Sequence, residues 1–151
     1  MNARPAHPPQ IYRLRAPNSP TSPKICRDTV TLLLRVNGHH PELVETAGLL
    51  VSELVTNVSV HTGSLAVRLE AVVRQDRVRV SVYDDEPDAP PDPSTPACSS
   101  ENGRGLLLVE AMAQAWGLGL AHPSDPSGRG GKHVWFELRH QSAESAASRA
   151  C

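Results

Sequence analysis

Hydrophobic side chains follow a helical period between residues 42 and 62. They recur at spacings of three and four residues: Leu43, Ala47, Leu50, Val51, Leu54 and Val58. This pattern predicts an amphipathic helix of about five to six turns, at ~3.6 residues per turn. Pro41 precedes the segment and Gly63 follows it, as expected at the two ends of a helix.

A row of polar residues lies beside this apolar stripe. Glu53, Asn57 and His61 are spaced four residues apart, which places them on one face of the predicted helix. A helix built only for burial rarely carries a carboxylate, an amide and an imidazole next to its core stripe. The row alone fits a solvated polar face as well as a functional one, so the choice depends on the rest of the chain.

Strict alternation predicts a β-hairpin after this helix. Apolar and polar residues alternate over residues 65–73 and again over 78–83, with Gln75-Asp76 as the turn. Each strand has one buried and one wetter face. We therefore expect an antiparallel pair that helices cover on one side.

The other predicted elements complete an α+β fold. They are an edge strand at 11–15, a helix at 24–36 with Ser22-Pro23 as N-cap and N1, a helix at 106–116 that Gly103-Arg104-Gly105 opens, and strands at 116–120 and 132–139. We expect a two-layer α/β sandwich, with a mixed, mostly antiparallel sheet and helices on one face. The domain would span 11–139, between an N-terminal arm (1–10) and a C-terminal tail (140–151). Residues 85–102, rich in Pro, Asp and Ser, are long enough to be a functional lid.

Charge and composition narrow the classes of partner and compartment. The 151 residues carry a net charge of −1, which predicts no direct nucleic-acid or membrane partner. We also expect no secretory signal and no membrane helix, which would need ~20 apolar residues. Three widely spaced cysteines suggest neither a disulfide framework nor a zinc site, which favours a reducing cytoplasm.

One common motif is excluded and a second is less favoured. The run from Gly128 to Lys132 is not a P-loop, because the first glycine is missing and His133 stands where Ser or Thr is required. His39, His40 and His61 have no carboxylate or thiol partner at metal-ligand spacing, so surface histidines are the better interpretation.

The remaining motifs, taken in order, resemble a known superfamily. Glu53-x-x-x-Asn57-x-x-x-His61, Asp84 at the end of the hairpin, a long loop, Gly-Arg-Gly at a helix start and a closing Val-Trp-Phe-Glu-Leu strand resemble the Bergerat-fold (GHKL, histidine-kinase-like) ATP-binding domain. The segments SELVTNVSVH, VSVYDDEPDAPP, NGRGLLLVEAMAQAWGL and GGKHVWFEL are similar to the stand-alone anti-sigma-factor serine/threonine kinases, in their actinomycete-type branch. The resemblance covers residues 11–139.

This resemblance implies ATP and Mg²⁺ as cofactors, with roles for the helical row. Asn57 would be the Mg²⁺ ligand, since a hard cation prefers oxygen ligands. Glu53, one turn earlier, would be the general base that takes the proton of an attacking hydroxyl. His61 matches the family's histidine, and we assign it to bracing the helix end.

The same resemblance implies the other nucleotide contacts. Asp84 would accept a hydrogen bond from the adenine amino group, and Gly103 and Gly105 would let backbone N–H groups approach the phosphates. Arg104 would either reach the phosphates or point to solvent. His133 would line the nucleotide site in the closing strand, where the family usually has Thr. Asp85-Glu86-Pro87 replaces glycines that kinase members usually carry after the adenine-binding Asp.

Two classes of function follow from these matches and departures. The first is a kinase that phosphorylates an anti-anti-sigma partner with Mg-ATP, sequesters a sigma factor, or does both; relatives of this type often form homodimers. The alternative is a non-catalytic regulatory binding module with weak or no nucleotide binding. A domain that docks onto a separate histidine kinase is less favoured, since the chain has no dimerisation helix.

Overall fold

The expected fold class is confirmed. In a computed structural model, residues 7–84, 102–120 and 132–140 are described. Their elements are β1 (Gln10–Pro17), α1 (Ser22–Val36), α2 (Pro41–His61), β2 (Ala66–Val73), β3 (Arg77–Asp84), α3 (Asn102–Met112), β4 (Ala115–Leu120) and β5 (Lys132–Arg139). The predicted lid, the 121–131 turn, most of the arm and the tail beyond His140 lie outside the described residues.

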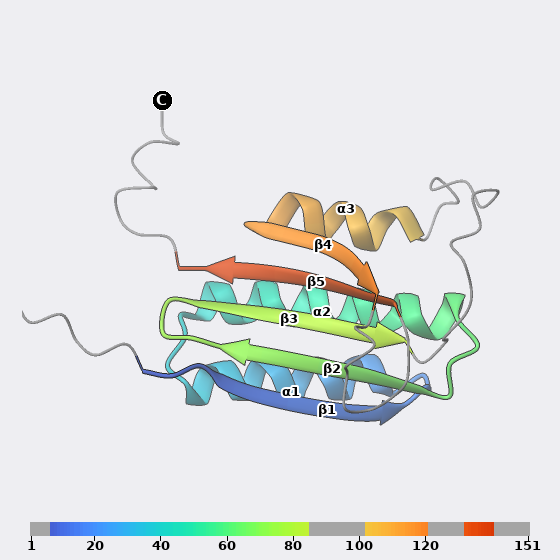
Figure 1. Cartoon of the computed structure of the whole chain (residues 1–151), viewed down its shortest axis with the longest axis horizontal. Helices are drawn as coiled ribbons and strands as arrows, with labels where there is room; N and C mark the ends of the chain where they lie inside the picture. Colours follow the sequence, from blue (N-terminus) through green and yellow to red (C-terminus); the bar gives the residue numbers. More distant parts are fainter. Residues whose placement is uncertain (1–6, 85–101, 121–131, 141–151) are drawn as a thin grey trace, which may run out of the picture.

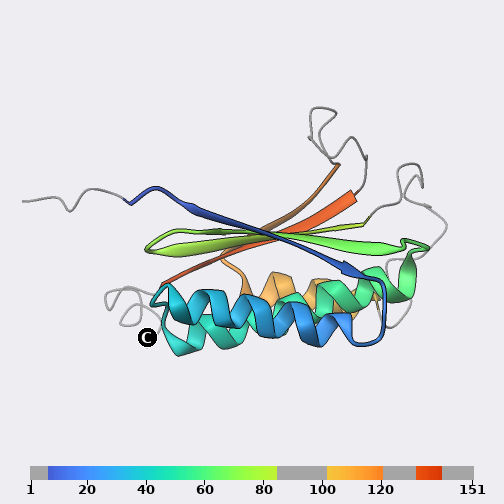
Figure 2. The ribbon, with the colours of Figure 1, turned by 90° about the horizontal axis from the view of Figure 1, so that it is seen from below.

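The sheet is five-stranded, in the order β1-β2-β3-β5-β4 (Figure 1). All four pairings among the described strands are antiparallel. The three helices of the described residues lie on one face of the sheet, and none of them covers the other face, which we call the open face (Figure 2). Alternation along the strands gives this arrangement, because Val78, Val80 and Val82 are buried under the helices while their neighbours point the opposite way.

Helix α2 is the centre of the core. It packs against α1, α3 and the sheet, and Ala47, Leu50 and Val51 are fully buried. Residues Pro41–Val60 are long and apolar enough to cross a membrane by composition alone. The same apolar residues fill the interior here, as they do in the core helix of a two-layer sandwich.

Several element boundaries differ from the sequence-based expectation by a few residues, and two of these differences have a clear structural reason. The N-cap of α1 is Thr21 rather than Ser22, since Ser22 is already helical and its hydroxyl donates to the Pro17 carbonyl oxygen. Helix α3 ends at Met112 instead of continuing to Trp116. The backbone leaves the helix there because the Gln114 N–H donates to the Glu137 carbonyl oxygen of β5, at 3.0 Å.

Candidate functional site

Four of the sequence motifs lie at the same end of the sandwich. The C-terminal half of α2, the end of β3, the start of α3 and the start of β5 all reach the right-hand edge of the fold in Figure 1. Helix α2 packs against both α3 and β3. Segments far apart in the sequence therefore form one candidate site.

Glu53 and Asn57 are half-buried on α2, one turn apart. Leu54 and Val55 beside them are buried and fix the orientation of the helix. Within the described residues, neither Glu53 nor Asn57 has a side-chain hydrogen bond or ion pair. A carboxylate and an amide oxygen that the fold does not engage are suitable donors for a hard cation, so these residues fit Mg²⁺.

Asp84 is the last residue of β3 and lies on the helix-covered face. Alternation puts it on the same side as Val80 and Val82. Its Oδ1 accepts a hydrogen bond from the Lys132 backbone N–H, at 3.1 Å. The carboxylate thus connects the end of β3 with the start of β5, on the side of the sheet where α2 lies.

Gly103, Arg104 and Gly105 belong to the first turn of α3, as the sequence predicted. The N-terminus of a helix presents unpaired backbone N–H groups and the positive end of the helix dipole, both of which favour phosphate. The side chains of residues 102–105 and of His61 lie outside what the structure describes. The roles assigned to His61 and Arg104 therefore stay predictions.

His133 lies on the opposite side of the sheet from Glu53 and Asn57. Its ring stacks on Tyr83, with ring centroids 4.8 Å apart, on the open face. Burial lowers the pKa of His133 below its usual range, and the nearby Glu70 only partly opposes this shift. The structure therefore does not bring His133 together with the other predicted nucleotide contacts, and its role in binding stays a prediction.

The comparison with family models decides the superfamily. The model described as the histidine kinase-like ATPase domain matches residues 16–134. The chain belongs to this family. No curated protein matches the chain. Membership in the histidine kinase-like ATPase family implies an ATP-binding module, usually with Mg²⁺, which agrees with the oxygen donors of α2.

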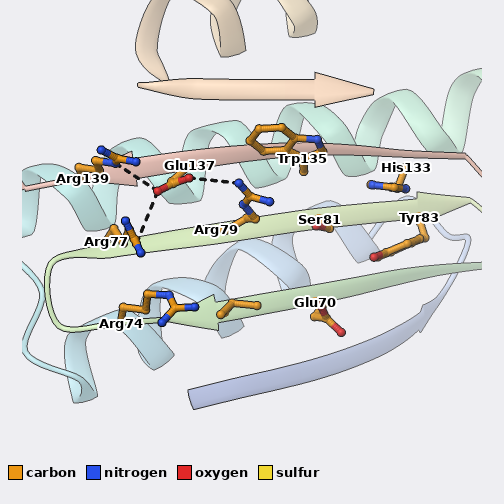
Figure 3. Close-up of a pocket in the computed structure, with 11 residues that line it drawn as sticks. Glu70, Arg74, Arg77, Arg79, Ser81, Tyr83, His133, Trp135, Glu137 and Arg139 are labelled. Atoms are coloured by element: carbon orange, nitrogen blue, oxygen red, sulfur yellow. Dashed lines mark hydrogen bonds and ion pairs between the residues drawn. The ribbon is translucent and has the colours of Figure 1, made fainter. Parts of the chain in front are cut away.

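This ATPase-like domain also has a groove that the sequence analysis did not predict. The groove, of about 630 Å³, opens on the helix-free face of the sheet. Figure 3 shows its lining, which includes Arg74, Arg77, Arg79, Tyr83, His133, Trp135, Glu137 and Arg139. Glu53, Asn57 and Asp84 are not part of it. Alternation within each strand was the available signal, because every second residue of β3 and β5 on this face is polar or aromatic.

Proposed function

We propose that this protein is a cytoplasmic, ATP-binding regulator of the anti-sigma-factor kinase type. It would phosphorylate a Ser or Thr of an anti-anti-sigma partner with Mg-ATP, sequester a sigma factor, or do both. The observation that carries the proposal is the convergence of three features on one side of the sheet. These are the unengaged Glu53–Asn57 pair, the carboxylate of Asp84 and the N-terminus of α3.

The proposed chemistry assigns one task to each feature. Asp84 selects adenine by accepting a hydrogen bond from its amino group, and the first turn of α3 holds the phosphates. Asn57 would hold Mg²⁺, which supplies neutralisation of the phosphate charge. Glu53 accepts the proton of the partner's hydroxyl while that oxygen bonds to the γ-phosphorus and the bond to ADP breaks.

A non-catalytic binding module is the second candidate. Two observations favour it. His133, which stands where the family usually has Thr, faces away from α2. The Oδ1 atom of Asp84 already accepts a bond from Lys132, so adenine would compete with the sheet for this carboxylate. In this candidate the protein would sequester its partner without phosphoryl transfer.

The Glu53→Gln variant distinguishes the two candidates. With γ-labelled ATP and an anti-anti-sigma protein as acceptor, we expect transfer to fall about 10²- to 10⁴-fold, the usual contribution of a general base. ATP affinity should change little, because the amide keeps the size of the side chain. The matched control is Glu45→Gln, at an exposed position of the same helix, which should transfer normally.

Three outcomes would change the assignment. Transfer by Glu53→Gln at the wild-type rate would show that the base is another group. Wild-type protein that binds ATP and the acceptor but transfers nothing would favour the second candidate. Equal losses in Glu53→Gln and Glu45→Gln would show that the charge of α2 matters more than the position of the base.

A further inference from the structure

Arginines gather on the open face of the sheet. Alternation and register put seven of them on this face: Arg13, Arg15, Arg68, Arg74, Arg77, Arg79 and Arg139. Glu70 and Glu137 are the acids that the same strands place there. The formal charge of these nine side chains is +5, although the whole chain has a net charge of −1. We call this set the arginine face.

Glu137 organises the centre of the arginine face. It is only 6% exposed, and its carboxylate oxygens lie 3.1 Å from Arg139, 3.3 Å from Arg79 and 3.6 Å from Arg77 (Figure 3). Burial would raise the pKa of Glu137, but hydrogen bonds from Arg139 and Arg79 outweigh it and hold the pKa below its usual range. The ionised carboxylate therefore fixes three guanidinium groups that remain one-third to one-half exposed.

Aromatic rings fill the spaces between these arginines. The Arg79 guanidinium lies 4.1 Å from the centroid of the Trp135 ring, and Arg68 lies 5.1 Å from that of Tyr83. Trp135 in turn covers Gly117 of β4, where an added Cβ would lie 2.8 Å from the indole Nε1. Stacking of this kind holds arginine side chains in place and reduces the entropy lost when they bind an anion.

We propose that the arginine face docks an acidic segment of a partner protein. Fixed guanidinium groups bind carboxylates through paired hydrogen bonds, and the +5 charge steers an acidic chain toward them. This surface goes beyond the proposed kinase activity. It lies on the helix-free side of the sheet, whereas Glu53, Asn57 and Asp84 belong to the helix-covered side.

Two other occupants fit the arginine face less well. Sheets that bind single-stranded nucleic acid stack bases on bare aromatic rings, but guanidinium groups already lie over Trp135 and Tyr83. A second copy that packed its own open face here would bring two strongly positive surfaces together, which is unfavourable.

The test uses the full-length protein and a fluorescent peptide of alternating Glu and Ala, with binding followed by anisotropy. The double variant Arg15→Glu/Arg74→Glu removes positive charge but leaves the three arginines around Glu137 intact. We expect its affinity for the peptide to fall about tenfold, because each charge reversal removes one attraction to the peptide and adds one repulsion. The neutral Arg15→Gln/Arg74→Gln variant should lose less affinity, and it serves if charge reversal disturbs folding.

The matched control changes the same amount of charge in the helical layer. Lys24→Glu/Arg35→Glu alters α1, on the other side of the sheet, and should keep the affinity within about twofold if the site is local. Nucleotide binding should be unchanged in both double variants, so a failed docking test would not be confused with a failed kinase assignment.

Each contrary result overturns the proposal. Equal losses in the two double variants would mean that only the overall charge attracts the peptide. Unchanged binding in Arg15→Glu/Arg74→Glu would place the peptide elsewhere. Tighter binding of single-stranded oligothymidine than of the acidic peptide, with loss in the same variant, would make the surface a nucleic-acid site.

Discussion

His39 Nδ1 lies 2.9 Å from His140 Nε2, although 101 residues separate the two histidines in the chain. Their ring planes are within 5° of each other. His39 is buried at the corner between α1 and α2. His140 directly follows β5, and its backbone N–H donates to the Asp76 carbonyl oxygen in the β2–β3 turn. This contact ties the helical layer to the end of the sheet that lies opposite the candidate nucleotide site.

The His39–His140 contact makes stability depend on pH. Burial lowers the pKa of His39 below its usual range, and the adjacent His140 lowers it further. The unfolded chain then binds more protons than the folded chain below a pH of about 6.5, the ordinary pKa of histidine. The contribution of neutral His39 to the free energy of unfolding should be fully present above that pH. It should be lost as the pH falls through the folded-state pKa of His39.

Urea unfolding between neutral and mildly acidic pH measures this dependence. His39→Gln should reduce stability at neutral pH by about 0.5–1.5 kcal/mol, the usual contribution of a hydrogen bond, and should flatten the pH dependence. His133, whose pKa is also lowered, should retain its own contribution. The exposed His7 provides the control: His7→Gln should leave the curve unchanged, and an unchanged curve in His39→Gln would refute the explanation.

Glu137 should matter more for stability than an exposed ion pair of the same sheet. Glu137→Gln leaves three guanidinium groups close together without their shared carboxylate, and we expect a loss of about 1–3 kcal/mol in the free energy of unfolding. The control is Glu70→Gln, which breaks the exposed Arg13–Glu70 pair and should cost less than about 1 kcal/mol. Equal losses would show that the buried cluster has no special role.

Gly48 of α2 lies directly against α1. A Cβ at this position would lie 2.8 Å from Thr31 Cγ2 and 3.2 Å from Arg27 Cγ. Overpacking costs about 1–3 kcal/mol, which exceeds the gain of about 1 kcal/mol in helix propensity from Gly to Ala. We therefore expect Gly48→Ala to lower the melting temperature.

A second substitution tests the steric cause. Thr31→Ser removes the Cγ2 atom that the added methyl group would meet but keeps the hydroxyl that donates to the Asp28 carbonyl oxygen. Gly48→Ala combined with Thr31→Ser should recover the stability of the parent chain or exceed it. If the double variant melts as low as Gly48→Ala, the loss does not come from the contact between the two helices.

Most of the fold could be predicted from local patterns. The alternation of residues 65–73 and 78–83 predicted both the hairpin and its buried face, and the helical period predicted α2. The same reasoning places His133 on the open face. Its neighbours Val134 and Phe136 face the core, so a residue one step away in the strand must face the open side. The family resemblance instead suggested a nucleotide contact for it.

The long-range contacts could not be predicted in this way. Pairing of β3 with β5 rather than with β4 is what brings Arg77 and Arg79 to Glu137, and no local pattern specifies that order. The contact between His39 and His140 likewise depends on how the α1–α2 corner meets the end of β5. Sequence periodicity reveals which face a residue occupies but not which strand lies beside it.

Calorimetry of ATP binding, with and without Mg²⁺, tests the central claim most directly. The wild-type chain should bind ATP in a Mg²⁺-dependent manner and prefer it to GTP. Asn57→Ala should lose most of the Mg²⁺ dependence, and the exposed Thr56→Ala on the same helix should not. No binding of ATP at millimolar concentration, or equal binding of GTP, would contradict a nucleotide site formed by α2, Asp84 and the start of α3.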